Sequence, residues 1–124
     1  MAGELAGARV LLLASSEVTR ELVKVYLAEG GAEVVEASDA RGLAVALGAY
    51  APQVAIVDLG PAAPAPPDVV PLLAGRGVDV LALAGRGDGG RAEAWRTAGA
   101  GVLEKPLAPD EVLSAVAARL ARHR

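Results

Sequence analysis

The chain has 124 residues, a formal net charge of −3 and no cysteine. This length predicts a single domain, 1–124, and the lack of cysteine excludes disulfides and thiolate metal sites. The mild negative charge argues against a nucleic-acid-binding surface, which needs a basic excess. No apolar run approaches membrane-spanning length, and the N-terminus lacks the pattern of a signal peptide. We therefore expect a cytoplasmic domain that binds neither membranes nor nucleic acids.

In the first half of the chain, apolar runs of strand length alternate with segments whose apolar residues have helical spacing. The run 8–14 predicts a buried strand, and Ser15 or Ser16 can cap the helix that follows. That helix is predicted over 17–29, with apolar positions at Val18, Leu22, Val25 and Tyr26. Residues 32–38 predict a less apolar strand that suits a sheet edge. Asp39 can cap a second helix from 40 to about 50.

The second half repeats the alternation around a proline-rich loop, 61–67. The further predicted strands are 53–59, 79–84 and 101–104. The further predicted helices are 69–74 with Asp68 as its cap, 91–98 after a glycine-rich loop, and 109 to about 122. Five strands alternating with five helices indicate βαβ units and a parallel sheet with right-handed crossovers. The fold class is therefore α/β, with a core over 8–122.

Asp58 is the first candidate for a chemical site. It follows Val54, Ala55, Ile56 and Val57, an apolar run typical of a strand buried on both faces. Because an unpaired charge is costly inside such a strand, we expect Asp58 to emerge where the strand ends. In an open parallel sheet, ligands bind at that end.

These residues resemble the receiver domain of two-component response regulators. In that family the third strand ends in the phospho-accepting aspartate, where Asp58 stands. The fifth strand ends in lysine and proline, where Lys105 and Pro106 stand, and the turn Gly99-Ala100-Gly101 also fits. The resemblance implies a flavodoxin-like doubly wound sheet of order 2-1-3-4-5. It also makes Lys105 the counter-ion of Asp58 and Pro106 a candidate for a cis peptide bond.

Four positions depart from the family pattern. Ala14 and Ser15 stand where receivers have the acidic pair that holds Mg²⁺, Ala84 replaces the Ser or Thr that holds the phosphoryl group, and Val102 replaces the switch aromatic. Transfer of a phosphoryl group to a carboxylate needs a cation to offset the repulsion, and Mg²⁺ needs carboxylates to hold it. We therefore expect a vestigial phospho-acceptor at Asp58, no catalytic residue, no enzymatic activity, and no metal or other cofactor.

The function that follows is a phosphorylation-independent interaction module in signalling. By resemblance, it contacts a signalling protein or a second copy through its fourth helix, fifth strand and fifth helix, at Trp95, Arg96, Val112 and Val116. Trp95 is equally suited to filling the core.

Two alternatives stay open. One is a working receiver, phosphorylated on Asp58 by a histidine kinase with Mg²⁺. The other is a small nucleotide-binding domain that uses Gly85, Gly87 and Gly90, since residues 85–90 match G-x-G-x-x-G between a strand and a helix.

Overall fold

The chain forms a five-stranded parallel sheet of order β2-β1-β3-β4-β5. The structure is a computed structural model that describes residues 3–60 and 65–122. Its strands are β1 (Arg9–Leu13), β2 (Glu33–Ala37), β3 (Val54–Leu59), β4 (Asp79–Ala84) and β5 (Gly101–Glu104). The strand order and the edge position of β2 confirm the predicted flavodoxin-like arrangement. Residues 61–64 of the predicted proline-rich loop lie outside the described residues.

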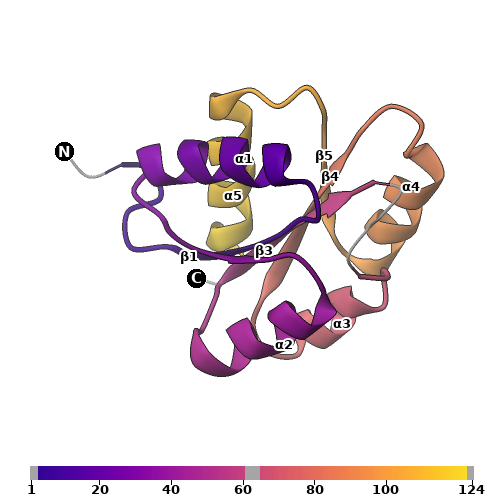
Figure 1. Cartoon of the computed structure of the whole chain (residues 1–124), viewed down its shortest axis with the longest axis horizontal. Coiled ribbons are helices and arrows are strands. Elements are labelled where there is room, and N and C mark those ends of the chain that lie inside the picture. The colour runs from indigo at the N-terminus through magenta and orange to yellow at the C-terminus, as the bar shows by residue number, and fades with distance from the viewer. Residues whose placement is uncertain (1–2, 61–64, 123–124) are drawn as a thin grey trace.

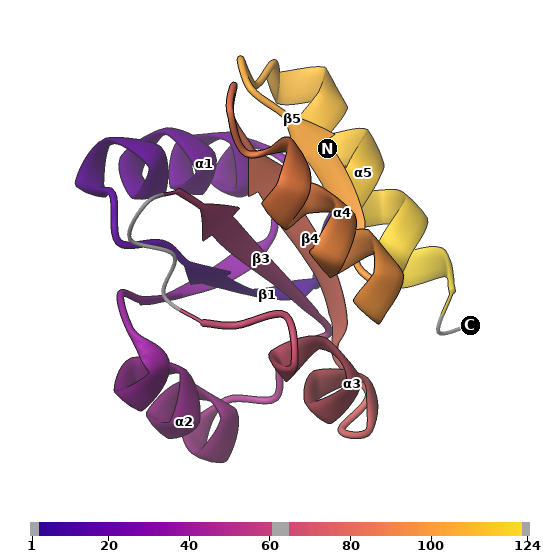
Figure 2. The same ribbon diagram turned by 90° about the vertical axis from the view of Figure 1, so that its right-hand side faces the viewer.

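Helices cover both faces of the sheet, as Figures 1 and 2 show. They are α1 (Glu17–Glu29), α2 (Ala40–Ala49), α3 (Val69–Ala74), α4 (Gly89–Ala98) and α5 (Pro109–Ala121). The buried side chains of α1 and α5 share one apolar cluster with alternate strand residues. Those of α2, α3 and α4 share the other. The two clusters lie on opposite faces of the sheet, because successive side chains of a strand point to opposite sides.

Side-chain caps begin two of the helices as predicted. Ser16 Oγ accepts a hydrogen bond from the Thr19 N–H (3.3 Å), and Asp39 Oδ1 accepts one from the Gly42 N–H (2.8 Å). The predicted cap of α3 is wrong: Asp68 precedes the helix but has helical backbone angles and makes no side-chain capping hydrogen bond. The helix α4 begins at Gly89, two residues before its predicted start, because the Asp88 carbonyl already accepts from the Ala92 N–H (2.8 Å).

The core extends further towards the N-terminus than the predicted limit of 8–122. Leu5 is only 1% exposed and packs in the cluster beneath α1 and α5. Its N–H donates to the Gly30 carbonyl (2.8 Å), and Gly3 packs so closely on Gly30 that a Cβ there would overlap its carbonyl oxygen. The segment before β1 therefore packs as part of the core near the amino end of the sheet.

The buried face of α1 agrees with the predicted apolar positions only at Tyr26, which is half-buried against the cluster that contains Val23 and Leu27. Val18 is 79% exposed, and Leu22 and Val25 are also exposed. The helix carries two apolar stripes of helical spacing, and spacing alone does not tell which of them faces the sheet. Among the described residues, no helix is long and apolar enough to cross a membrane.

Candidate functional site

The candidate site lies at the carboxyl ends of β1 and β3. The register places Leu13 beside Val57, so Ala14 follows next to Asp58. Asp58 is the penultimate residue of β3 and only 5% exposed. It lies near the end of the strand as predicted, but it is buried there and does not emerge into solvent. A charge in this position requires a nearby partner of opposite sign.

Lys105 is that partner. Its main-chain N–H donates to the Ala84 carbonyl (2.8 Å), which continues the hydrogen bonding between β4 and β5. The peptide bond that follows, Lys105–Pro106, is cis. The Lys105 Nζ lies 2.6 Å from Asp58 Oδ1. The two groups carry opposite charges, so the contact is an ion pair between the ends of β3 and β5.

A response regulator receiver domain from Clostridium thermocellum superimposes with a TM-score of 0.80 at 24% sequence identity, over 93% of this chain and 95% of that chain. The chain has the fold of a response regulator receiver domain. A Chloroflexus aurantiacus protein assigned as a response regulator gives a TM-score of 0.79 at 26% identity, over 93% of this chain and 98% of that one.

The same fold also occurs as part of a longer protein. NtrX from Brucella abortus gives a TM-score of 0.81 at 24% identity, over 99% of this chain and 28% of that chain. No protein-family model matches this sequence, and no curated protein matches it.

The receiver fold implies Mg²⁺ beside the phospho-acceptor, and the residues present do not fit that ion. Mg²⁺ prefers octahedral oxygen ligands and is usually held by carboxylates. Here Ala14 contributes a buried methyl group, Ser15 has no carboxylate, and the one carboxylate, Asp58, faces an ammonium group. The described residues include no group of three acidic, histidine or cysteine side chains able to hold a metal.

Arg20 holds the loop that follows β1, a role that no sequence motif indicated. Its Nη1 donates to the carbonyls of Ala14 (2.7 Å) and Ser15 (3.2 Å). Its Nε lies 4.0 Å from the Glu36 carboxylate at the end of β2. The side of the site where receivers keep an acidic pair thus contains a guanidinium bound to main-chain oxygens.

The two positions that receivers use for switching are apolar in this chain. Ala84 ends β4 beside Leu59 and Glu104, and its buried methyl group offers no hydroxyl to a phosphoryl group. Val102 is half-buried and packs against the cluster under α2, α3 and α4. A valine lacks the ring that would move between two positions.

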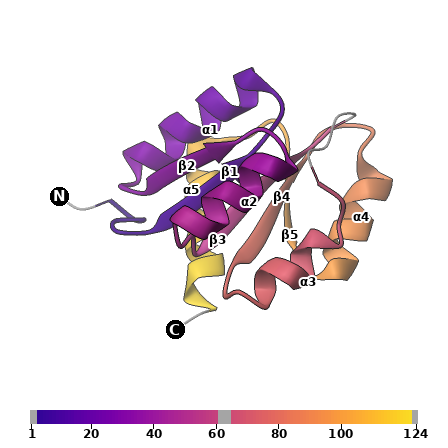
Figure 3. The same cartoon turned by 60° about the horizontal axis from the view of Figure 1, so that its bottom comes forward.

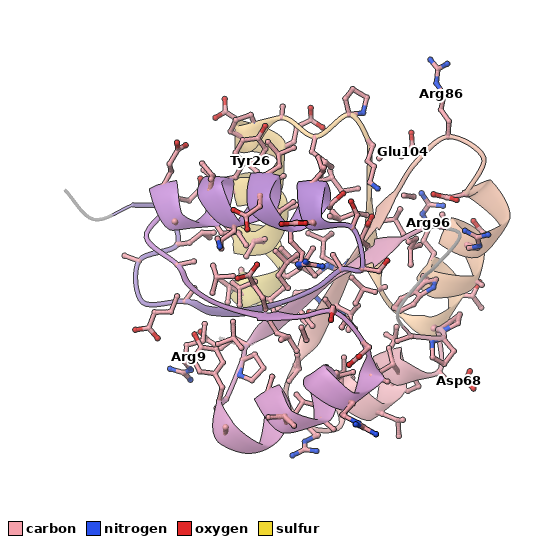
Figure 4. All side chains as sticks on the ribbon, in the orientation of Figure 1. Arg9, Tyr26, Asp68, Arg86, Arg96 and Glu104 are labelled. Carbon is pink, nitrogen blue, oxygen red and sulfur yellow. The ribbon has the colours of Figure 1, made fainter. Side chains whose placement is uncertain are left out.

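The predicted contact surface on α4 and α5 is wrong for three of its four residues. Trp95 is 2% exposed, and Val112 and Val116 are fully buried. The apolar spacing of α5 marks its sheet-facing side, and Trp95 fills the core beneath α4. Arg96 is exposed and pairs with Glu93 at 3.2 Å; Figure 4 shows it on α4 with Glu104 on the neighbouring strand.

In the glycine-rich loop, the carboxylate of Asp88 binds groups that a phosphate would otherwise contact. The Gly85 N–H donates to Asp88 Oδ2 (2.9 Å), and Asp88 Oδ1 pairs with Arg91 at 3.2 Å. Gly87 has a φ of +86°, which favours glycine, so this glycine serves a turn. Arg86 extends away from the loop in Figure 4. A carboxylate just before α4 would repel a pyrophosphate, so the geometry does not favour the nucleotide-binding alternative.

A second buried carboxylate, Asp79, lies at the opposite end of the sheet, at the start of β4. Arg119 of α5 donates to its Oδ1 (2.9 Å), and Arg122 Nε lies 3.6 Å from its Oδ2. The acid begins a predicted strand and the arginines end a predicted helix, so only the packing of α5 brings them together.

Proposed function

We propose that this chain is a signalling interaction module whose contacts do not depend on phosphorylation of Asp58. Its fold implies a role in signal transduction. The observation that carries the rest of the proposal is the pair Ala14 and Ser15, which leaves Asp58 without a neighbouring carboxylate and with Lys105 as its ion-pair partner.

The chemical reason is electrostatic. A phosphoryl donor is anionic and must approach an anionic carboxylate, and a divalent cation normally offsets that repulsion. Lys105 supplies one positive charge, but an ammonium group has no vacant coordination positions with which to orient a donor. The module would therefore keep the receiver fold as a scaffold and would not be an enzyme.

The proposed partner is another signalling protein or a second copy of the chain. On the face formed by α4, β5 and α5, the exposed side chains include charged groups such as Arg96 and Glu104. Contacts through these charges would weaken with rising salt, because exposed ion pairs are screened.

The test is treatment of the full chain with acetyl phosphate and Mg²⁺, followed by intact-mass measurement. We expect no added phosphoryl group and no saturable change in the amide resonances of Ser15 and Asp58 on titration with Mg²⁺. The double variant A14D/S15D is the matched control, because it restores two carboxylates beside Asp58 and should respond to Mg²⁺. A phosphoryl group on the wild-type chain that is lost in D58N would refute the proposal and support the working receiver.

A further inference from the structure

The outer edge of β2 offers unpaired main-chain groups. β2 is a terminal strand of the sheet and pairs only with β1. The Glu33 N–H donates to the Ala8 carbonyl, and the Ala37 carbonyl accepts from Ala14. Because alternate residues of a strand direct their main-chain groups to opposite edges, those of Val34 and Glu36 face outward. Outside the sheet ladder, no main-chain hydrogen bond between described residues uses them.

An open groove runs beside this edge, between β2 and α2. Its volume is about 620 Å³, and its apolar lining comes from Val35, Val45, Ala46, Ala49 and Tyr50. Figure 3 shows β2 at the margin of the sheet with α1 and α2 on either side of it. The small side chains of α2 leave room for another chain to approach the strand.

Tyr50 lines this groove and lies close to the acidic side chain of Glu33. Its hydroxyl oxygen is shielded from solvent, and Glu33 acts on it through charge and side-chain hydrogen bonding. Burial raises the pKa of Tyr50 above its ordinary value, and the negative charge of Glu33 raises it further. The groove therefore contains a buried phenol next to an acidic side chain.

The residues that face α2 form a charge pattern along the strand. Glu33, Val35 and Ala37 share this face, and Asp39 follows just beyond the strand. The order is acidic, apolar, apolar, acidic. Neither Glu33 nor Asp39 belongs to an ion pair between described residues, whereas Glu36, on the other face, pairs with Lys24 at 3.4 Å. Arg41 is the one cationic residue in the groove lining.

We propose that this edge binds an extended peptide segment, which adds a strand to β2 and places a basic, apolar, apolar, basic pattern against α2. Main-chain hydrogen bonds to Val34 and Glu36 would align the segment, and the groove would select its side chains. A second copy of β2 fits less well, because pairing two such strands brings four glutamates together. The inference involves neither Asp58 nor its phosphorylation, so it stands apart from the proposed function.

The test uses the full chain and a synthetic peptide, acetyl-Lys-Thr-Val-Thr-Val-Thr-Lys-amide, whose alternate residues read Lys, Val, Val, Lys in either direction. We expect saturable amide shifts centred on Val34, Glu36 and Tyr50. Two N-methylated isomers separate strand addition from simple groove filling. Methyl groups on the amides that face β2 should abolish binding, and methyl groups on the alternate amides should leave it intact.

Two protein variants provide the matched control. V45K places a positive charge in the groove and should weaken binding about tenfold, equivalent to about 1.4 kcal/mol. L72K changes a similarly exposed apolar residue on α3 and should leave binding unchanged.

Four results would overturn the inference. They are no saturation at millimolar peptide, equal binding of both methylated isomers, equal effects of V45K and L72K, and shifts centred on α1. Sedimentation of the chain without peptide tests whether a second copy of the chain occupies this edge. A dimer that dissociates in the V34P variant would assign the edge to that second copy.

Discussion

Asp58 and Asp79 are both buried carboxylates paired with basic side chains, at opposite ends of neighbouring strands. Asp58 is 5% and Asp79 is 9% exposed. Asp58 Oδ1 pairs with one ammonium group, Lys105 Nζ, at 2.6 Å. Asp79 accepts from the Val80 N–H and from Arg119, both at 2.9 Å, and lies near Arg122 as well. The buried carboxylate at the carboxyl end of the sheet therefore has fewer partners among the described residues than the one at the amino end.

The difference leads us to expect that Asp79 contributes more to the stability of the fold than Asp58 does. Arg119 also lies against Gly101, where a Cβ would overlap its guanidinium group, so β4, β5 and α5 meet at this one ion pair. Between described residues, Asp58 forms one ion pair, with a lysine whose side chain is 32% exposed. This contrast predicts that stability depends on the amino end of the sheet much more than on the carboxyl end.

The largest expected effect comes from R119M. The substitution keeps the length of the side chain but removes the closer of the two arginines that pair with the Asp79 carboxylate. Breaking a buried ion pair by removing one partner costs about 3 kcal/mol or more. Denaturant unfolding of wild type and variant measures this loss. A loss below about 1 kcal/mol, the value of an exposed pair, would remove the contrast between the two ends.

G101A tests the same ion pair from the other side. The added methyl group should displace the guanidinium and lower the free energy of unfolding by a smaller amount than R119M. Because both changes act through Arg119, the double variant G101A/R119M should be no less stable than R119M alone. Additive losses would mean that Gly101 is needed for another reason. G90A is a suitable control, since a Cβ at Gly90 meets no atom within 4 Å.

D58N should change stability by about 1 kcal/mol or less. The substitution removes one member of an ion pair whose lysine is 32% exposed and therefore partly screened by solvent. Denaturant unfolding at low and high salt should give nearly the same difference between variant and wild type. A loss as large as that of R119M would show that Asp58 is as structural as Asp79.

The smallest effect concerns Tyr50, near the amino end of the sheet. Burial raises the pKa of Tyr50, so the neutral phenol favours the folded state. That contribution is fully present below the ordinary tyrosine pKa of about 10 and is lost as the pH rises through the folded value. Y50F should remain stable where wild type loses stability above about pH 10. The side-chain hydrogen bond to Glu21 raises the pKa of Lys24 too, but both proteins retain it, so their difference isolates Tyr50.

The sequence alone predicted the order of elements and the candidate site. Apolar runs of strand length alternate with helical spacing, and that alternation permits few topologies. Asp58 and Lys105 follow separate apolar strands, and parallel strands bring their carboxyl ends to one edge of the sheet. The absence of carboxylates at Ala14 and Ser15 is likewise a property of the sequence.

Only the tertiary structure decided which faces are buried and which distant charges meet. The helix α1 has two apolar stripes, and contact with the sheet selects Val23 and Leu27 while leaving Val18 exposed. The same packing buries Trp95 and joins Arg119 to Asp79 across 40 residues. Periodicity specifies that a helix has an apolar side, but the partner of that side depends on how every other element has packed.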